Sequence, residues 1–153
     1  MSIESVRAFL AEKAPDVAII ELTTSTATVA LAAAAHGVEP GRIAKTLSLR
    51  VGEENLLLVT RGDSRLDNRK IKAVFGGKPR LLEAEEVEML TGHPVGGVCP
   101  FGLATPLPVY CDVSLKAFDE IVPAAGSTHS ALRISPLRMA ALIGAEWVDV
   151  IQD

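Results

Sequence analysis

Apolar residues along the chain switch between helical and strand spacing. Ile3, Val6 and Leu10 recur at the spacing of one helix face, which predicts a helix over residues 2–13. β-branched, alternating runs bounded by Gly and Pro predict strands. The same patterns predict further helices over about 27–36, 67–75, 83–90 and 136–143, a helical turn near 115–118, and strands over 17–22, 43–51, 55–61, 108–113, 120–123, 132–135 and 146–151.

The order of these segments indicates the fold class. The predicted strands 43–51 and 55–61 flank Gly52-Glu53-Glu54, which is typical of a hairpin. Several other connections are too short for the crossover that parallel neighbours require. We therefore expect a single α+β domain over residues 1–153, with a mixed, largely antiparallel sheet surrounded by helices.

Composition narrows the class of protein. Hydrophobic residues make up 48% of the chain and charged residues 22%, so it can bury a core without a disulfide or metal. The net charge of −4 disfavours a protein that grips long nucleic acids, although it allows a local contact with an RNA end. Cys99 and Cys111 lack zinc-site spacing, and we expect neither metal nor cofactor. With no signal-peptide pattern and no membrane-length apolar run, a cytoplasmic protein is expected.

Residues 92–102 form the most informative segment, G-H-P-V-G-G-V-C-P-F-G. Prolines fix φ, whereas glycines permit positive φ and close backbone approach. Such a loop can be stiff and still direct several N–H groups at one point, as a site for an oxyanion or carbonyl requires. It could equally be a structural loop. The sequence matches neither the P-loop pattern nor GxGxxG.

Lys45 is the second candidate. In a strand over 43–51 it shares one face with Ile43, Leu47 and Leu49. A lysine on an apolar face is costly to bury without a partner. Its ammonium could extend to water at the sheet edge, or bind a phosphate or carboxylate in a pocket.

Other polar residues carry weaker signals. Asp67 and Lys70 have the spacing of a surface pair, or Asp67 caps a helix. His129 lies among small hydroxyl residues and could orient a water or bind a ribose hydroxyl. His93 is expected to be an exposed loop residue. Cys99 is adjacent to the same loop, but no cysteine-hydrolase signature surrounds it, so we do not expect it to be a nucleophile.

Taken in order, these segments resemble the YbaK/prolyl-tRNA-synthetase-associated domain family, which contains free-standing trans-editing proteins and the editing insertion of bacterial prolyl-tRNA synthetases. The resemblance covers nearly the whole chain. It runs through the small-residue segment 26–37, I-A-K-T-L at 43–47, R-G-D at 61–63, Leu66-Asp67 with Lys70, the 92–102 loop, residues 109–112, and Gly126 through L-R-I-S-P at 132–136.

The resemblance implies hydrolysis of mischarged aminoacyl-tRNA, most simply tRNA-Pro carrying a small non-cognate amino acid such as Ala or Cys. The partner would be the tRNA acceptor end, with a synthetase or elongation factor as a further candidate partner and no membrane involved. Lys45 would hold the terminal nucleotide and loop amides would face the scissile carbonyl. The implied catalytic residues are Lys45, Gly92, Pro94, Gly96, Gly97 and Pro100, and the implied substrate-binding residues are Thr26, Thr46, Phe101, Gly102, Gly126, Ser127 and His129.

Two alternatives stay open at this point. One is a non-catalytic module of the same fold that binds nucleotides or small ligands. The other is a hydrolase of different activated esters or thioesters, which would have a pocket too narrow for adenosine. The sequence contains no GxSxG nucleophile motif, but an aminoacyl ester is already activated and needs positioning more than a protein nucleophile.

Overall fold

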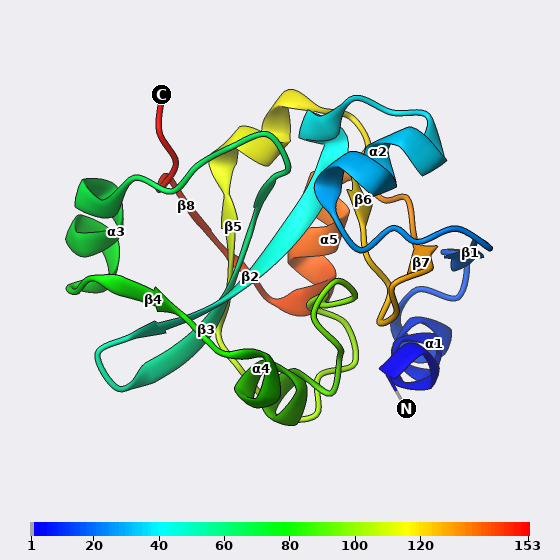
Figure 1. The fold of residues 1–153 in the computed structure, drawn as a ribbon, viewed down its shortest axis with the longest axis horizontal. Coiled ribbons are helices and arrows are strands. Elements are labelled where there is room, and N and C mark those ends of the chain that lie inside the picture. Colours follow the sequence, from blue (N-terminus) through cyan, green and yellow to red (C-terminus); the bar gives the residue numbers. More distant parts are fainter. Residues whose placement is uncertain (1) are drawn as a thin grey trace.

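The computed structural model describes residues 2–153 as an α+β domain with a mixed sheet (Figure 1). The helices are α1 (Ser2–Lys13), α2 (Val29–His36), α3 (Asn68–Phe75), α4 (Ala84–Thr91) and α5 (Pro136–Ile143), with the 3-10 helices η1 (Pro40–Arg42) and η2 (Val113–Ala117). The strands are β1 (Ile20–Glu21), β2 (Ile43–Val51), β3 (Glu54–Arg61), β4 (Pro79–Leu81), β5 (Val109–Asp112), β6 (Val122–Pro123), β7 (Ser130–Ala131) and β8 (Glu146–Val148).

The main sheet has the strand order β4-β2-β3-β5-β8, and β6 also pairs with β2. The predicted hairpin is confirmed, because β2 and β3 pair antiparallel along their whole length and Gly52 has the positive φ of 63° that a tight hairpin turn needs. β4 joins β2 antiparallel, whereas β6, β5 and β8 join their neighbours in parallel. The sheet is therefore mixed, as expected, with a larger parallel share than the connection lengths indicated.

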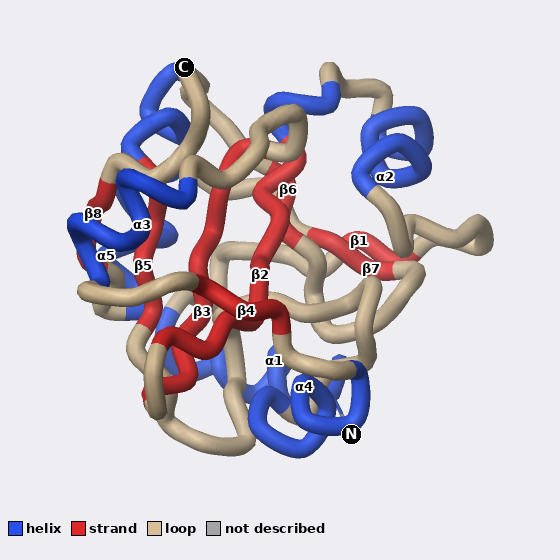
Figure 2. The backbone as a smooth tube through the Cα atoms, turned by 60° about the vertical axis from the view of Figure 1, so that its left-hand side comes forward, coloured by secondary structure: helices blue, strands red, loops and turns tan. Residues whose placement is uncertain are grey.

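Helices cover both faces of this sheet, because its central strands are apolar on both sides. Leu57 and Val59 of β3 face the main core, which α1 and α5 complete. Leu56 and Leu58 face the opposite way, into a second cluster closed by Ile71 of α3. In Figures 1 and 2, α1 and α4 lie at one end of the molecule and α2 lies at the other.

Helix ends follow local side-chain chemistry. Asp67 accepts hydrogen bonds from the first turn of α3, which confirms its predicted capping role, and Ser135 caps α5 in the same way. The N-cap of α2 is Thr28, whose hydroxyl accepts from the N–H of Leu31. Lys70 does not pair with Asp67, because its Nζ lies 3.1 Å from Asp149 and 3.0 Å from Asp153.

Short strands are where the expectations fail. Of the strand expected over 17–22, only Ile20 and Glu21 form a strand, β1, because only these two residues pair with a partner strand, β7. The strand expected over 132–135 lies earlier, as β7, and Ile134 makes only an isolated bridge with Ile121. β4 was not expected, because Pro79 and Arg80 lack the pattern of a buried strand.

Candidate functional site

A pocket of about 300 Å³ lies against a stretch of β2 that has no partner strand on its outer side. On that side β6 pairs only with Ile43 and Ala44, and β4 pairs only with residues 49–51 (Figure 2). Residues 45–48 lie in between and line the pocket. The open strand edge therefore forms one wall of the pocket.

Main-chain polar groups of this edge point into the pocket. The carbonyl oxygen of Ser48 points away from β3, because it accepts a hydrogen bond from the N–H of Leu82 at 3.0 Å. Backbone groups alternate in direction along a strand, so the N–H and C=O of Thr46 point the same way as those of Ser48. Since neither β6 nor β4 reaches Thr46, its two polar groups face the pocket.

Lys45 is half-buried and lines the pocket, the second of the two positions that the sequence left open for it. Its Nζ donates a hydrogen bond to the carbonyl oxygen of Ser64 at 2.6 Å. Burial lowers the pKa of the Lys45 ammonium, and the nearby carboxylate of Asp63 acts in the opposite direction. Among the lining residues within 2–153, Lys45 alone carries a charge, so the lining of the pocket is positively charged.

Two hydroxyl groups in the pocket are buried and unpaired. Thr46 and Ser48 project from the same face of β2, and Ser48 is only 7% exposed. Neither Thr46 Oγ1 nor Ser48 Oγ has a hydrogen-bond partner within residues 2–153. A buried hydroxyl without a partner costs about 1–3 kcal/mol, so such groups in a pocket indicate a site for a polar ligand.

The 92–102 loop forms another part of the pocket wall through Val95, Gly96 and Val98. Gly96 has a φ of 92° and lies so close to Ala27 that a Cβ would stand 2.9 Å from the Ala27 Cβ. A Cβ on Gly97 would lie 2.7 Å from backbone atoms of Ser127. The glycines therefore let the loop pack directly on two neighbouring segments.

The loop N–H groups divide into two kinds. The N–H of Gly97 donates to the Pro94 carbonyl at 2.9 Å and is used inside the loop. The N–H groups of Gly96 and Val98 have no backbone acceptor within residues 2–153, and both residues line the pocket. If the loop binds a carbonyl or oxyanion, these two groups are available for it and that of Gly97 is not.

His93 holds the loop from behind. The prediction that it is exposed was wrong, because His93 is fully buried and its Nε2 lies 2.8 Å from the Phe101 carbonyl oxygen. Burial lowers the pKa of the His93 imidazole, so the ring is held neutral and donates to that oxygen. Cys99 Sγ lies 3.6 Å from the same nitrogen, and Phe101 packs on Phe9 with ring centroids 5.9 Å apart.

Cys99 lies in the main core and does not line the pocket. Burial raises the pKa of its thiol to about 12, so the thiolate needed for nucleophilic attack is suppressed. The other cysteine, Cys111, is equally buried, in β5. Neither cysteine lines the pocket.

The segment that begins at Gly126 forms hydrogen bonds with the 92–102 loop and with Thr26, just before α2. Thr26 donates from both its N–H and its hydroxyl to the Thr128 carbonyl, at 2.6 and 3.1 Å. The N–H of Gly126 donates to the Gly97 carbonyl at 3.0 Å. His129 is exposed, bonds to the Thr128 hydroxyl through Nδ1, and does not line the pocket. Ser130, one residue further on, does line it.

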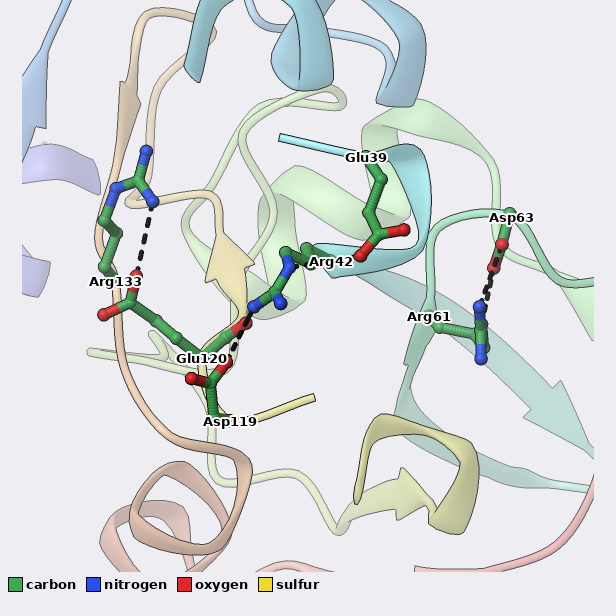
Figure 3. A network of polar contacts seen from close by, with 7 residues as sticks. All are labelled: Glu39, Arg42, Arg61, Asp63, Asp119, Glu120 and Arg133. Atoms are coloured by element: carbon green, nitrogen blue, oxygen red, sulfur yellow. Dashed lines mark hydrogen bonds and ion pairs between the residues drawn. The ribbon is translucent and has the colours of Figure 1, made fainter. Parts of the chain in front are cut away.

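Arg42, just before β2, and Arg61, at the end of β3, form ion pairs with acidic side chains (Figure 3). Arg61 pairs with Asp63 at 2.6 Å, and Arg42 pairs with Asp119 at 2.8 Å. Both guanidinium groups also lie over the Phe118 ring, 5.2 Å from its centroid for Arg42 and 4.8 Å for Arg61. These ion pairs neutralise the two guanidinium groups, neither of which lines the pocket, so Lys45 is the positively charged residue of the described lining.

The structure brings part of the predicted residue set together. Of the predicted residues, Thr26, Lys45, Thr46 and Gly96 line the pocket, whereas Gly92, Pro94, Gly97, Pro100, Phe101, Gly102, Gly126, Ser127 and His129 do not. Ser48, Val95 and Val98 line it and were missed, although Ser48 follows Thr46 at the two-residue spacing of one strand face. Within residues 2–153, no three His, Cys, Asp or Glu side chains gather as metal ligands.

Comparisons with known proteins agree on one family. The aminoacyl-tRNA editing domain profile matches residues 23–142. The "Uncharacterized protein YwhH" of Bacillus subtilis (strain 168) is 44% identical over 155 residues, covering 100% of this chain and 99% of the relative. A proline–tRNA ligase of Geobacter sp. (strain M21) is 32% identical over 102 residues, covering 66% of this chain but only 18% of the ligase.

Among solved structures, a crystal structure named "putative trans-editing enzyme for prolyl tRNA synthetase" superposes with a TM-score of 0.91. It is 35% identical and covers 99% of this chain and 98% of the other.

None of the helices within residues 2–153 is long and apolar enough to cross a membrane.

Proposed function

Because the chain belongs to the aminoacyl-tRNA editing domain family, we propose that it hydrolyses the ester bond of mischarged aminoacyl-tRNA. The observation that carries the proposal is the pocket itself. Lys45, which alone among the lining residues within 2–153 carries a charge, lines the same cavity of about 300 Å³ as Gly96 and Val98, whose N–H groups have no backbone acceptor within those residues. A cation suits a phosphate, and paired N–H groups suit a carbonyl whose oxygen becomes negative.

Lys45 anchors the terminal nucleotide in this proposal. Its Nζ has one protein acceptor, the Ser64 carbonyl, and an ammonium has three donors. The remaining donors can bind a phosphate or ribose oxygen at the pocket mouth. The nearby Asp63 favours the charged form of Lys45, while its own carboxylate is paired with Arg61 and so competes less for the ammonium.

The chemical step uses positioned water. Its oxygen bonds to the ester carbonyl carbon, the carbon–oxygen bond to the ribose breaks, and the leaving ribose oxygen takes a proton. The neighbouring ribose hydroxyl of the substrate assists, so no protein nucleophile is needed. The N–H groups of Gly96 and Val98 stabilise the oxyanion. Gly92, Pro94, Gly97, Pro100, Phe101 and Gly102 then act by holding the loop in shape.

The substrate we propose is tRNA-Pro carrying a small non-cognate amino acid such as Ala or Cys. The walls around the open edge include Ala27, Ala32 and Val98, which leave room for a small side chain. Steric exclusion can reject a bulky residue, whereas one methylene discriminates by only about 1–3 kcal/mol. The similarity to proline–tRNA ligases supports tRNA-Pro as the partner. Thr26 lines this end of the pocket, whereas Gly126, Ser127 and His129 would act on it only indirectly, through the segment that bonds to Thr26 and Gly97.

Deacylation of charged tRNA tests the proposal. The panel contains tRNA-Pro charged with Ala, Cys, Ser, Thr, 2-aminobutyrate or Pro, at micromolar protein. We expect hydrolysis above the buffer rate for at least one small amino acid. Lys45→Ala should lower kcat/KM by more than tenfold, because it removes a charge-assisted contact. Lys13→Ala, an exposed lysine of α1, is the matched control and should match the wild type.

Failure of every ester to exceed the buffer rate would refute the deacylase and favour the non-catalytic binding module. An unchanged kcat/KM for Lys45→Ala would refute the role given to Lys45 alone. Binding of the bare tRNA is expected to be weak, since the net charge is −4. A nanomolar Kd at low salt would contradict that expectation and remove the need for a delivering synthetase or elongation factor.

A further inference from the structure

The open edge of β2 presents oxygen acceptors to a pocket that lacks carboxylates. The Thr46 carbonyl points into the gap between β4 and β6, and the hydroxyls of Thr46 and Ser48, on one face of the same stretch of β2, are buried without partners among residues 2–153. No Asp or Glu of the described chain lines the pocket. The acceptors available to a ligand on this wall are therefore uncharged oxygens.

Any aminoacyl ester brings a group that needs such acceptors. Its α-amino group is attached to the carbon next to the scissile carbonyl, so it enters the pocket wherever the carbonyl does. Lys45 cannot receive it, because an ammonium has no acceptor and repels a second positive charge. A buried amino group left without acceptors would weaken binding.

We infer that the open edge at Thr46 and Ser48 is the site that binds the α-amino group of the ester-linked amino acid, an assignment that rests on the proposed function. The Thr46 carbonyl and the Ser48 hydroxyl accept its N–H groups. The 92–102 loop, which also lines the pocket, carries the N–H groups of Gly96 and Val98, which donate to the carbonyl oxygen. Donors and acceptors from two different segments fix the orientation of the amino acid between them.

Stable substrate analogues test this site without hydrolysis. The probes are adenosines whose 3′ position carries alanine or propionic acid in amide linkage, which differ only in the α-amino group. By calorimetry, the wild type should bind the alanyl analogue about tenfold or more tightly than the propionyl analogue. Ser48→Ala should reduce that ratio to about threefold or less, and Ser48→Thr, which keeps a hydroxyl, should preserve more of it.

Ser114→Ala is the matched control, because Ser114 Oγ is also buried and unpaired within residues 2–153 but does not line the pocket. It should leave the ratio unchanged. Equal binding of the two analogues by the wild type, or a ratio that Ser48→Ala does not change, overturns the inference while the proposed function stands. If neither analogue binds, the proposed function fails and takes this site with it.

Discussion

Substitution of Gly97 by alanine probes how the loop is held against its neighbour. A Cβ at this position would lie 2.7 Å from both the N and the C atoms of Ser127 and 2.8 Å from its Cα. All three are backbone atoms, so no side-chain rotation relieves the contact. About 0.7 Å of extra separation is needed to reach the 3.4 Å at which ordinary contact begins. Hydrogen bonds from Gly126 to Gly97 and from Gly97 to Pro94 resist that movement.

Overpacking of this kind costs about 1–3 kcal/mol of unfolding free energy. For a chain of this length, that lowers the Tm by about 2–12 °C, since each kcal/mol corresponds to about 2–4 °C. The same displacement moves the adjacent N–H groups of Gly96 and Val98 away from the carbonyl they would bind. We therefore expect Gly97→Ala to lower kcat/KM for the best ester by more than tenfold, measured well below its Tm.

Gly77→Ala is the control for this experiment. Its φ is not positive, and a Cβ there would meet the Val51 Cγ1 at 3.0 Å, a methyl group that can shift, and the Gly52 N at 3.9 Å, an ordinary contact distance. Its Tm and its kcat/KM should stay close to those of the wild type. A Gly97→Ala protein that matches the wild type in both Tm and kcat/KM would show that the loop is not clamped to Ser127 as argued.

Two further predictions concern the buried groups behind the loop. Cys99→Ser should retain most deacylase activity, because the thiol is buried and its pKa is raised to about 12; a loss beyond about a hundredfold in a folded protein would restore a thiol mechanism. His93 has a pKa below its unfolded value of 6.5, so its stabilising contribution is complete above pH 6.5 and is lost as the pH falls through the folded value. Urea unfolding at pH 7.5 and 5.5 should thus show a larger loss for the wild type than for His93→Gln, and equal losses would contradict the assignment.

Long elements were predictable because their signals are local. The β2–β3 hairpin follows from two alternating runs around Gly52, and α5 follows from Ser135 and Pro136 at its start. β4 and β7 could not be located, because two or three residues carry too little pattern. Their positions depend on which backbone edge happens to be free nearby, and that is a property of the assembled sheet.

The residues of the candidate site show the same contrast between a local sequence signal and a property of the assembled fold. Lys45 was identifiable, because a charge within an apolar strand conflicts with simple packing. Ser48 was not, because a serine on a strand is unremarkable until its neighbours are known to leave it unpaired. His93 shows the opposite error: a polar residue between Gly92 and Pro94 looks exposed in sequence, yet the Phe101 carbonyl makes its burial possible.

The pocket exists because two short strands stop before they meet. β6 ends at Pro123, after which Ala124 pairs instead with Ala131, and β4 ends at Leu81, just before the start of α4. The chain after β6 pairs with another segment and the chain after β4 turns into α4, so the intervening edge keeps polar groups that a complete sheet would consume. Leaving them unpaired costs stability in the empty protein. A sheet interrupted at this one position converts that cost into affinity for a ligand that supplies the missing partners.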